Sequence, residues 1–355
     1  MIEKNSFEPL YLQVKKDLMD QIEDGRIKVG DKLPSENEMM VLYGVSRMTV
    51  RSALSELVQE GCVRKEQGAG SFCIAVPEKI KHINVDVMMN YGDTFFVPYL
   101  INGINSILET ENASLIIHDT KDSMQGIIDC MNDALKHGTD GVIFQLCHVQ
   151  ENKQELRKVL EQFRQKNIPT VAICGDVPDS EANSLNIDDY YGACAAASYM
   201  LECGHKKVLG LFSLPEYGAG ERWRGVRETL GRSKKTSLFV ENTDGNYMDR
   251  VLDTIKKEKI TGIICHNDII AVNCMHVLQE NGFRIPEDVS IIGYDDLDIS
   301  MSTNPQLTTI SHPKDHMGRD AAKILLLHIR GVNTQRTDYI YRPELVIRQS
   351  VMKIN

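Results

Sequence analysis

The first 75 residues carry apolar positions at helical spacing, and residues that break helices interrupt the pattern. The first stripe consists of Leu10, Val14, Leu18 and Ile22. The segment GRIKVGDKLPS ends this stripe with two glycines and a proline, which predicts a connection. In the next predicted helix, Ser35 and Glu38 have the spacing of a capping box, and Gly44 ends that helix early.

A third helix is predicted to follow Ser46, which is placed to be its N-cap. Its apolar face consists of Val50, Ala53, Leu54, Leu57 and Val58. Arg47 projects from the first turn, and Arg51 lies on the opposite, polar face. The segment CVRKEQGAGSFCI has two β-prone runs around QGAG and predicts a hairpin. Three helices followed by a hairpin form a winged helix-turn-helix.

From His82 onward, short apolar runs alternate with amphipathic helical segments. The runs of strand length are INVDVMM, ASLIIHD, GVIFQL, PTVAIC, KVLGLFS, TGIICHN and VSIIGYD. This rhythm predicts an α/β fold with parallel sheets that helices cover on both faces. About ten strands are too many for one compact layer, so we expect two lobes. The predicted parts are a winged helix over residues 1–76, a linker over 77–81 and a two-lobed domain over 82–355.

Composition and cysteine content narrow the class of protein. The chain has the 42% hydrophobic and 25% charged residues of an ordinary soluble protein, and its apolar runs are too short for a transmembrane span. The N-terminus is charged throughout and lacks the apolar core of a secretory signal, so we expect a cytoplasmic protein. Nine scattered cysteines without metal-ligand spacing predict reduced thiols and no metal site.

The net charge of −10 argues against binding nucleic acid by bulk electrostatics. Residues 1–80 contain 11 Lys/Arg and 13 Asp/Glu, so the winged helix has no positive excess either. Contact with DNA must therefore come from a local patch, such as the polar face of the third helix, where arginine can pair with guanine. An amphipathic helix with two arginines can also be an ordinary surface helix with a solvated polar face. The segments before and after this helix therefore decide between a DNA-binding helix and a surface helix.

The stretch LPSENEMMVLYGVSRMTVRSALSELVQEGCVRKEQGAGSF resembles the DNA-binding domain of the GntR family, and the resemblance covers residues 9–75. It implies that Ser35 and Glu36 lie at a phosphate-facing helix start. The implied contacts from the recognition helix and the wing are Arg47, Met48, Thr49, Arg51, Gln67, Gly68 and Gly70. Met48 can contact only a thymine methyl, while Glu36 either caps its helix or accepts a hydrogen bond from a cytosine amino group.

Three segments of the larger domain carry candidate chemistry. GAGERWRGV lacks the third glycine of a dinucleotide fingerprint and is not in the first βα unit, so no such cofactor is expected. In CHNDIIAVNCMHVL, Asn267 or Asp268 can cap the next helix or face the ligand crevice of an open sheet. Asp295 and Asp296 follow a strand, where carboxylates serve acid–base catalysis or bind sugar hydroxyls. No nucleophile or phosphate-binding loop accompanies these carboxylates, which disfavours an enzyme.

Residues 82–352 resemble the effector domain of the LacI/GalR family through RWRGV, CHNDIIAVNCMHVLQENGFRIPEDVSIIGYDD, PQLTTISHPKDHMG and YRPELVIRQS. Joined to a GntR-type domain, this domain is typical of AraR-like arabinose repressors. The resemblance implies sugar contacts from polar strand ends and from two aromatic rings. The implied residues are Tyr91, Phe95, His118, Gln145, Asp176, Arg222, Asn267 or Asp268, and Asp295. The polar residues among them could also serve only as helix caps.

The sequence thus predicts a transcriptional repressor that is not an enzyme and needs no cofactor. We expect a homodimer, because a two-fold protein reads double-stranded operator DNA with two half-sites. A small sugar, L-arabinose or another pentose, is expected to bind between the lobes and, by the resemblance, to release DNA through its different affinity for two states. A transport-type sugar-binding protein would share the larger fold, but it would carry an export signal and no winged helix.

Overall fold

The computed structural model describes residues 9–66, 69–75, 82–92, 95–146, 153–175, 177, 179–212, 218–232, 236–241, 247–332 and 335–354. The chain divides into two compact units, Met1–Lys81 and His82–Asn355. The predicted linker at 77–81 lies outside the described residues. Within the described ranges, no helix combines the length and the apolar character that crossing a bilayer requires.

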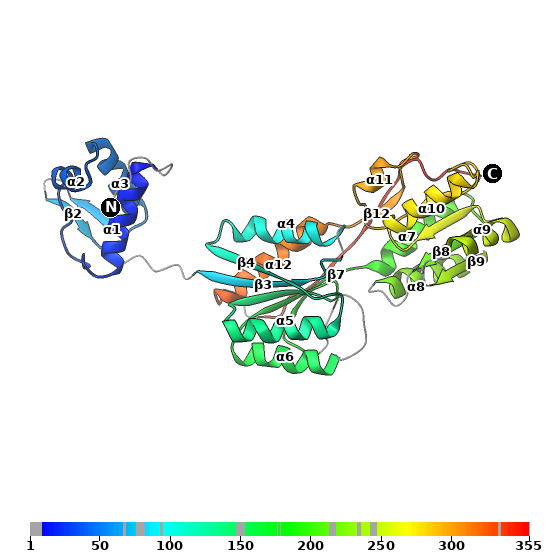
Figure 1. Cartoon of the computed structure of the whole chain (residues 1–355), viewed down its shortest axis with the longest axis horizontal. Coiled ribbons are helices and arrows are strands. Elements are labelled where there is room, and N and C mark those ends of the chain that lie inside the picture. Colours follow the sequence, from blue (N-terminus) through cyan, green and yellow to red (C-terminus); the bar gives the residue numbers. More distant parts are fainter. Residues whose placement is uncertain are drawn as a thin grey trace. The chain divides into compact units, whose positions relative to one another are not determined.

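The first unit consists of three helices and an antiparallel hairpin (Figure 1). Its elements are α1 (Leu10–Glu23), α2 (Glu36–Tyr43), α3 (Arg47–Gln59), β1 (Val63–Glu66) and β2 (Gly70–Cys73). The capping box of Ser35 and Glu38 is present, and Gly44 ends α2 with a φ of 62°. Ser46 accepts a hydrogen bond from the backbone N–H of Thr49. The predicted elements and caps of this unit are therefore confirmed.

The core of the first unit forms where the apolar stripes of α1 and α3 meet. The buried residues of these two stripes include Val14, Leu18, Ile22, Val50, Ala53, Leu54 and Leu57. Val58, which the sequence placed on the same face of α3, is 40% exposed. At about 100° per residue, Val58 lies farthest from the centre of that face, so the neighbouring helix does not cover it.

The second unit contains a six-stranded parallel sheet in the order β13-β7-β6-β5-β3-β4. The strands are β3 (Ile83–Met89), β4 (Ala113–Asp119), β5 (Gly141–Gln145), β6 (Thr170–Ile173), β7 (Asn183–Ile187) and β13 (Asp338–Tyr341). One face is covered by α4 (Val97–Leu108) and α12 (Lys314–Ile329). The other face is covered by α5 (Met124–His137) and α6 (Lys153–Gln165).

A second parallel sheet has the order β11-β10-β8-β9 and forms the other lobe of this unit. Its strands are β8 (Lys207–Phe212), β9 (Thr236–Glu241), β10 (Gly262–Cys265) and β11 (Ser290–Ile292). One face packs on α7 (Asp189–Glu202) and α8 (Ala219–Arg232), the other on α9 (Tyr247–Glu258) and α10 (Asp268–Glu280). The short helix α11 (Ile299–Ser302) and the antiparallel pair β12 (Thr309–Ser311) and β14 (Glu344–Val346) complete the lobe.

The predicted α/β fold with two parallel sheets and helices on both faces is confirmed. The chain passes between the two lobes three times: from β7 to α7, from β12 to α12 and from β13 to β14. The carboxyl ends of parallel strands lie at one edge of a sheet, and this edge is where open α/β sheets bind ligands. The residues that follow the strands near these three crossings are therefore candidates for a ligand site.

Candidate functional site

The exposed face of α3 and the start of α2 form one polar surface on the first unit. Arg51 donates through Nε to Oε2 of Glu36 at 3.0 Å, and Lys65 on β1 donates to Oε1 of the same carboxylate at 2.8 Å. Glu36 thereby joins α2, α3 and the hairpin. The contact of Arg51 uses Nε, so its two terminal nitrogens keep the fork that can pair with the O6 and N7 atoms of guanine.

The pKa of Glu36 reflects its contacts with the two cationic side chains. The hydrogen bond from Lys65 lowers the pKa of the Glu36 carboxyl; burial opposes this effect and the Arg51 bond reinforces it. Arg47 donates to the amide oxygen of Asn37 at 2.6 Å, and Met48 is 73% exposed. The surface therefore offers both arginines and an exposed apolar side chain, and within the chain Arg47 contacts Asn37 while Arg51 and Lys65 contact Glu36.

Three further predicted DNA contacts lie around this surface. Ser35 uses its hydroxyl to cap α2, and Thr49 at the start of α3 is half-buried. Gly70 in the hairpin has a φ of 119°, and a Cβ there would meet Cε of Lys32 at 2.7 Å, so the position favours glycine. Gln67 and Gly68 lie outside the described residues. Sequence reasoning did not single out Asn37 and Lys65, whose pairing depends on how the helices pack.

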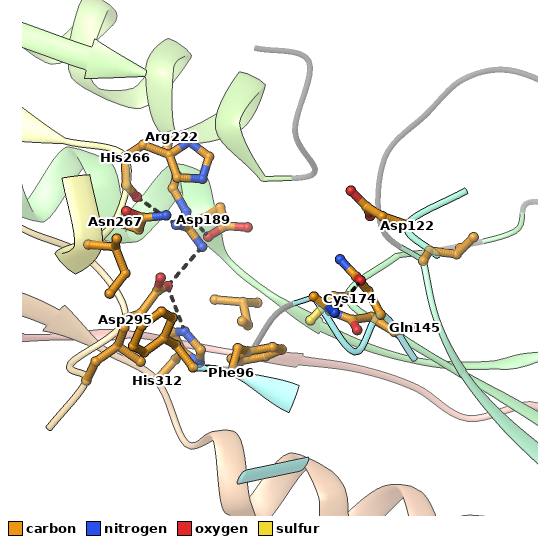
Figure 2. A pocket seen from close by; sticks show the side chains of 17 residues that line it. Phe96, Asp122, Gln145, Cys174, Asp189, Arg222, His266, Asn267, Asp295 and His312 are labelled. Carbon is orange, nitrogen blue, oxygen red and sulfur yellow. Dashed lines mark hydrogen bonds and ion pairs between the residues drawn. The ribbon is translucent and has the colours of Figure 1, made fainter. Parts of the chain in front are cut away.

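A cavity of about 420 Å³ lies at the strand ends of the second unit (Figure 2). This volume falls within the range of small-molecule sites. Its lining on the side of the six-stranded sheet includes Asn90, Phe95, Phe96, Asp122, Gln145 and Cys174. Its lining on the side of the second sheet includes Arg222, His266, Asn267 and Asp295, with Asp189 and His312 at two of the crossings. The residues of both lobes thus face one space.

Arg222 on α8 is the centre of the polar network in this cavity. Its Nε donates to Asp189 at 2.8 Å, one terminal nitrogen donates to the carbonyl of His266 at 2.8 Å, and the other lies 3.4 Å from Asp295. The guanidinium also stacks on the ring of Tyr294 at 3.7 Å. Burial lowers the pKa of Arg222, but the charges of Asp189 and Asp295 outweigh burial and raise it above its usual value. The side chain is therefore a charged anchor between three segments.

Asp295 is held from both sides and has an unusual backbone. His312 lies with Nε2 at 3.2 Å from Oδ1 of Asp295, and because a carboxylate only accepts, Nε2–H is the donor. Burial raises the pKa of Asp295, but the charge of Arg222 and the hydrogen bond from His312 together outweigh burial. The pKa of this carboxyl therefore lies well below its usual range. Burial lowers the pKa of His312, which keeps the imidazole neutral near pH 7. The φ of Asp295 is 100°, a strained conformation of the kind that gathers at functional sites.

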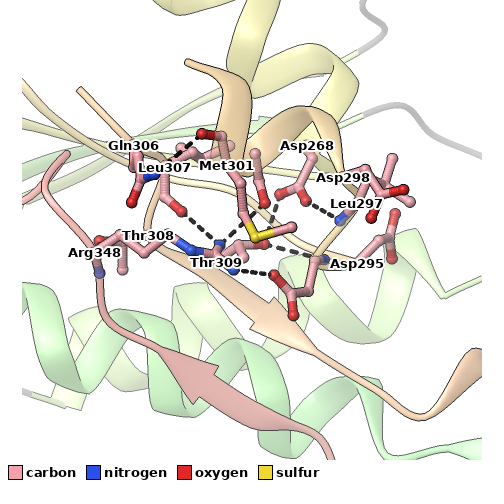
Figure 3. A network of polar contacts seen from close by, with 12 residues as sticks. Asp268, Asp295, Leu297, Asp298, Met301, Gln306, Leu307, Thr308, Thr309 and Arg348 are labelled. Atoms are coloured by element: carbon pink, nitrogen blue, oxygen red, sulfur yellow. Dashed lines mark hydrogen bonds and ion pairs between the residues drawn. The ribbon is translucent and has the colours of Figure 1, made fainter. Parts of the chain in front are cut away.

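Asp268 is not part of the cavity lining, and it belongs to a polar network that also includes Asp295 (Figure 3). It is fully buried and accepts hydrogen bonds from the hydroxyl of Thr309 at 2.5 Å and from the backbone N–H of Leu297 at 2.8 Å. Desolvation by burial raises the pKa of its carboxyl to about 7, although the Thr309 bond acts in the opposite direction. Asn267, its neighbour, caps α10 by accepting from the N–H of Ile270 and also lines the cavity.

Asp268→Asn should change the pH dependence of stability. The folded protein keeps the proton on Asp268 up to about pH 7, whereas an unfolded chain loses it near the usual aspartate pKa of 3.8. Unfolding then releases a proton, so the free energy of unfolding falls as pH rises from about 4 to 7. Relative to the variant, the wild type should lose up to about 4 kcal/mol over this range.

Denaturant titrations at several pH values would measure this difference. Asp288→Asn is the matched control, because the hydrogen bond from Arg284 lowers the pKa of Asp288 to about 2. Its stabilisation is present above the unfolded pKa and is lost only as pH falls below about 4. Parallel curves for wild type and Asp268→Asn between pH 4 and 7 would show that Asp268 is already ionised in the folded protein at pH 5.

Some of the predicted effector residues line the cavity, others do not, and one lies outside the described residues. Phe95, Gln145, Arg222, Asn267 and Asp295 line the cavity. Tyr91, His118 and Asp268 do not belong to its described lining, and Asp176 lies outside the described residues. The signal used for His118 was its place near a strand end, but its side chain turns to the buried Asp86, with a contact of 2.5 Å. The ring of His137 reaches the same carboxylate at 3.1 Å.

Sequence reasoning missed several residues of the cavity. Asn90, Asp122 and His266 follow strands that the apolar pattern had found, so the rule used for Gln145 could have found them. Asp189 follows β7, whose polar sequence NSLNI does not predict a strand, so the position of Asp189 after a strand could not be recognised. His312 lies in the crossing from β12 to α12, which no local pattern distinguishes. Among the described residues, no three His, Cys, Asp or Glu side chains are arranged to hold a metal ion.

Comparison with known families agrees with this two-part architecture. Residues 10–73 match the family described as bacterial regulatory proteins, gntR family, and residues 160–351 match the periplasmic binding protein-like domain. The chain is 31% identical to the arabinose metabolism transcriptional repressor of Halalkalibacterium halodurans, over 97% of this chain and 96% of that protein. It is 27% identical to the repressor of the same description from Geobacillus stearothermophilus, over 98% of each chain. These relatives are repressors and not enzymes.

Solved structures share the fold of the second unit. A LacI family transcriptional regulator from Enterococcus faecalis with bound ribose superposes with a TM-score of 0.66 at 25% identity, covering 77% of this chain and 100% of that one. The lac repressor dimer bound to operator and an anti-inducer gives a TM-score of 0.66 at 20% identity, covering 77% of this chain and 95% of that one.

Proposed function

Because the chain belongs to the family of transcriptional repressors that join a gntR-type DNA-binding domain to a periplasmic binding protein-like domain, we propose that a small sugar controls its binding to operator DNA. The sugar is a pentose, with L-arabinose the first candidate. Two relatives are named for arabinose metabolism, and a relative of known structure holds ribose. The observation that carries the proposal is the cavity whose charged and amide side chains meet from both lobes.

The lining of the cavity suits a polyhydroxy ring. Asp295 and Asn267 offer oxygen acceptors to adjacent hydroxyls, and the amide of Gln145 offers both a donor and an acceptor. Phe95 and Phe96 offer apolar surface to the less polar side of a sugar. Binding there draws on residues of both lobes, so the sugar favours whichever lobe arrangement brings them together, and only this difference in affinity shifts the DNA-binding state.

The DNA-binding part of the proposal rests on the first unit. In this proposal, residues 1–76 form the DNA-binding domain, residues 77–81 form the linker, and residues 82–355 form the sugar-binding and dimerisation domain. A homodimer presents two recognition helices to an operator with two half-sites, and the pentose lowers operator affinity. Arg47 and Arg51, exposed on α3, provide the base and phosphate contacts.

Titration calorimetry with pentoses and hexoses, followed by gel shifts, tests the proposal. The duplex for the gel shift is DNA from upstream of the gene, with and without the sugar that binds. We expect a retarded band at low salt that one pentose weakens. Folded protein that retards no band at low salt, or that binds none of these sugars, would contradict the proposal.

Arg51→Ala should cost about 1–3 kcal/mol of operator affinity and relax the base preference at one position of each half-site. The reason is the loss of a fork that pairs with guanine, while Glu36 keeps its bond to Lys65 and the hairpin stays in place. Competition gel shifts against single-base operator variants would measure the effect. If affinity for a random duplex falls by the same factor, Arg51 contacts only phosphate.

A further inference from the structure

We propose that the cavity accepts only uncharged sugars and excludes their phosphorylated or oxidised, anionic forms, and that Asp189 sets this specificity. This inference rests on the proposed function and deepens it by defining the class of ligand. It follows from how the chain uses the groups in the cavity that could otherwise hold an anion.

The first of these groups is Arg222, the single cationic side chain among the described residues of the lining. A guanidinium recognises phosphate or carboxylate through its fork of N–H donors. All three nitrogens of Arg222 are already engaged, by Asp189, by the carbonyl of His266 and by Asp295. The side chain is 8% exposed and lines the cavity, and each of its nitrogens already has a partner within the chain. Arg222 therefore organises the site and does not receive an anion.

The second group consists of helix starts, whose N–H groups commonly hold phosphate. Three of the helices that begin next to the cavity, α5, α7 and α10, are capped by the chain's own side chains, whereas α4 and α12, which begin beside Phe96 and His312, have no side-chain cap. Asp188 accepts from Tyr191 at the start of α7, and Asn267 accepts from Ile270 at the start of α10. At the start of α5, Ser123 accepts from Gly126. At the starts of α5, α7 and α10 the capping side chains occupy the positions that a phosphate would need.

The charge of the lining points in the same direction. Its charged side chains among the described residues are one guanidinium and three carboxylates, from Asp122, Asp189 and Asp295. Lys314, two residues after His312, is not part of the described lining and donates to the backbone carbonyls of Asp295 and Asp296. An anion entering this space meets an excess of negative charge, which costs affinity.

Asp189 is the residue that makes the difference. It is 5% exposed, and its carboxylate pairs with Nε of Arg222 at 2.8 Å, which offsets the charge of the guanidinium. Asp189→Asn removes one negative charge and weakens the hold on Arg222 with almost no change of shape. Phosphoryl transfer to the sugar, or its oxidation to an acid, would therefore end the signal, so that the chain reports the sugar before either reaction consumes it.

The test is calorimetric titration of the full-length chain with matched neutral and anionic probes: L-arabinose with L-arabinonate, and D-ribose with D-ribose 5-phosphate. We expect at least one neutral pentose to bind and its anionic partner to bind at least 100-fold more weakly. In Asp189→Asn the ratio should fall at least tenfold, mostly because the anion binds better. Asp188→Asn is the matched control, because it removes the neighbouring charge, keeps the cap and does not touch Arg222.

The possible results distinguish a failure of the charge specificity from a failure of sugar control itself. Anion binding as tight as that of the neutral sugar in the wild type overturns the inference and leaves sugar control standing. Binding of neither probe overturns both. An unchanged ratio in a folded Asp189→Asn, or an equal change in Asp188→Asn, overturns the role of Asp189. If Asp189→Asn does not fold, the wild-type ratio still decides the specificity claim.

Discussion

Replacing Asp295 with asparagine should weaken sugar binding at least about 100-fold, equivalent to about 2.7 kcal/mol, while the protein still binds its operator without the sugar. The carboxylate accepts from His312 and pairs with Arg222, and it also lines the cavity. Both partners contact Oδ1, so an amide of the same shape removes the negative charge that pairs with Arg222 and places a donor where Oδ2 can accept from a sugar hydroxyl. Breaking such a buried pair costs several kcal/mol where the other partner is held in place.

The measurement is calorimetry for the sugar and a gel shift for the operator, with a thermal unfolding curve to show that the variant is folded. Asp296→Asn is the matched control. Asp296 is the next residue, pairs with Arg348 at 2.6 Å and is not part of the cavity lining. It should therefore lose an ion pair without losing the sugar response. Sugar affinity within tenfold of wild type in Asp295→Asn would show that the sugar binds elsewhere.

The elements that carry strong local signals could be predicted from the sequence. The capping box at Ser35, the cap at Ser46 and the seven apolar runs each depend on residues that are close in the chain, and all appear as expected. Strand β7 differs because its segment NSLNI is polar. Asn183 and Ser184 are buried there, and their side chains bond to the carbonyl of Thr170 and to Asp338. Such partners, distant in sequence, leave no hydrophobic period.

The candidate site divides in the same way. Arg222 could be proposed from family resemblance, and Asn267 and Asp295 also from their positions after strands. The resemblance did not indicate what holds them, because the contacts of Asp189 and His312 form only when two crossings between the lobes come together. The same limit explains His118, whose place near a strand end suggested a ligand contact. A side chain near a strand end can turn to a neighbouring strand, and periodicity carries no information about that choice.

Close packing of two helices supports the cavity, and two glycines permit it. A Cβ on Gly103 of α4 would lie 2.3 Å from the backbone oxygen of Asp315, and one on Gly318 of α12 would lie 2.2 Å from that of Leu100. Neither helix can yield by rotating a side chain, because backbone atoms make both contacts. The pair also positions the site, since α4 follows Phe96, α12 begins just after His312, and these two rings pack edge to face at 5.4 Å.

Gly103→Ala should therefore destabilise the second unit by about 2–4 kcal/mol, because the helices must separate to admit one methyl group. The separation should also move His312 away from Phe96 and weaken sugar binding in the protein that remains folded. Gly220→Ala is the matched control, because Gly220 lies in α8 with nothing within 4 Å of an added Cβ. That change should instead stabilise by about 0.5–1 kcal/mol, since alanine favours a helix more than glycine does. Denaturant unfolding of both variants measures the difference, and equal stabilities would mean that α4 and α12 are less closely packed in solution than their glycines allow.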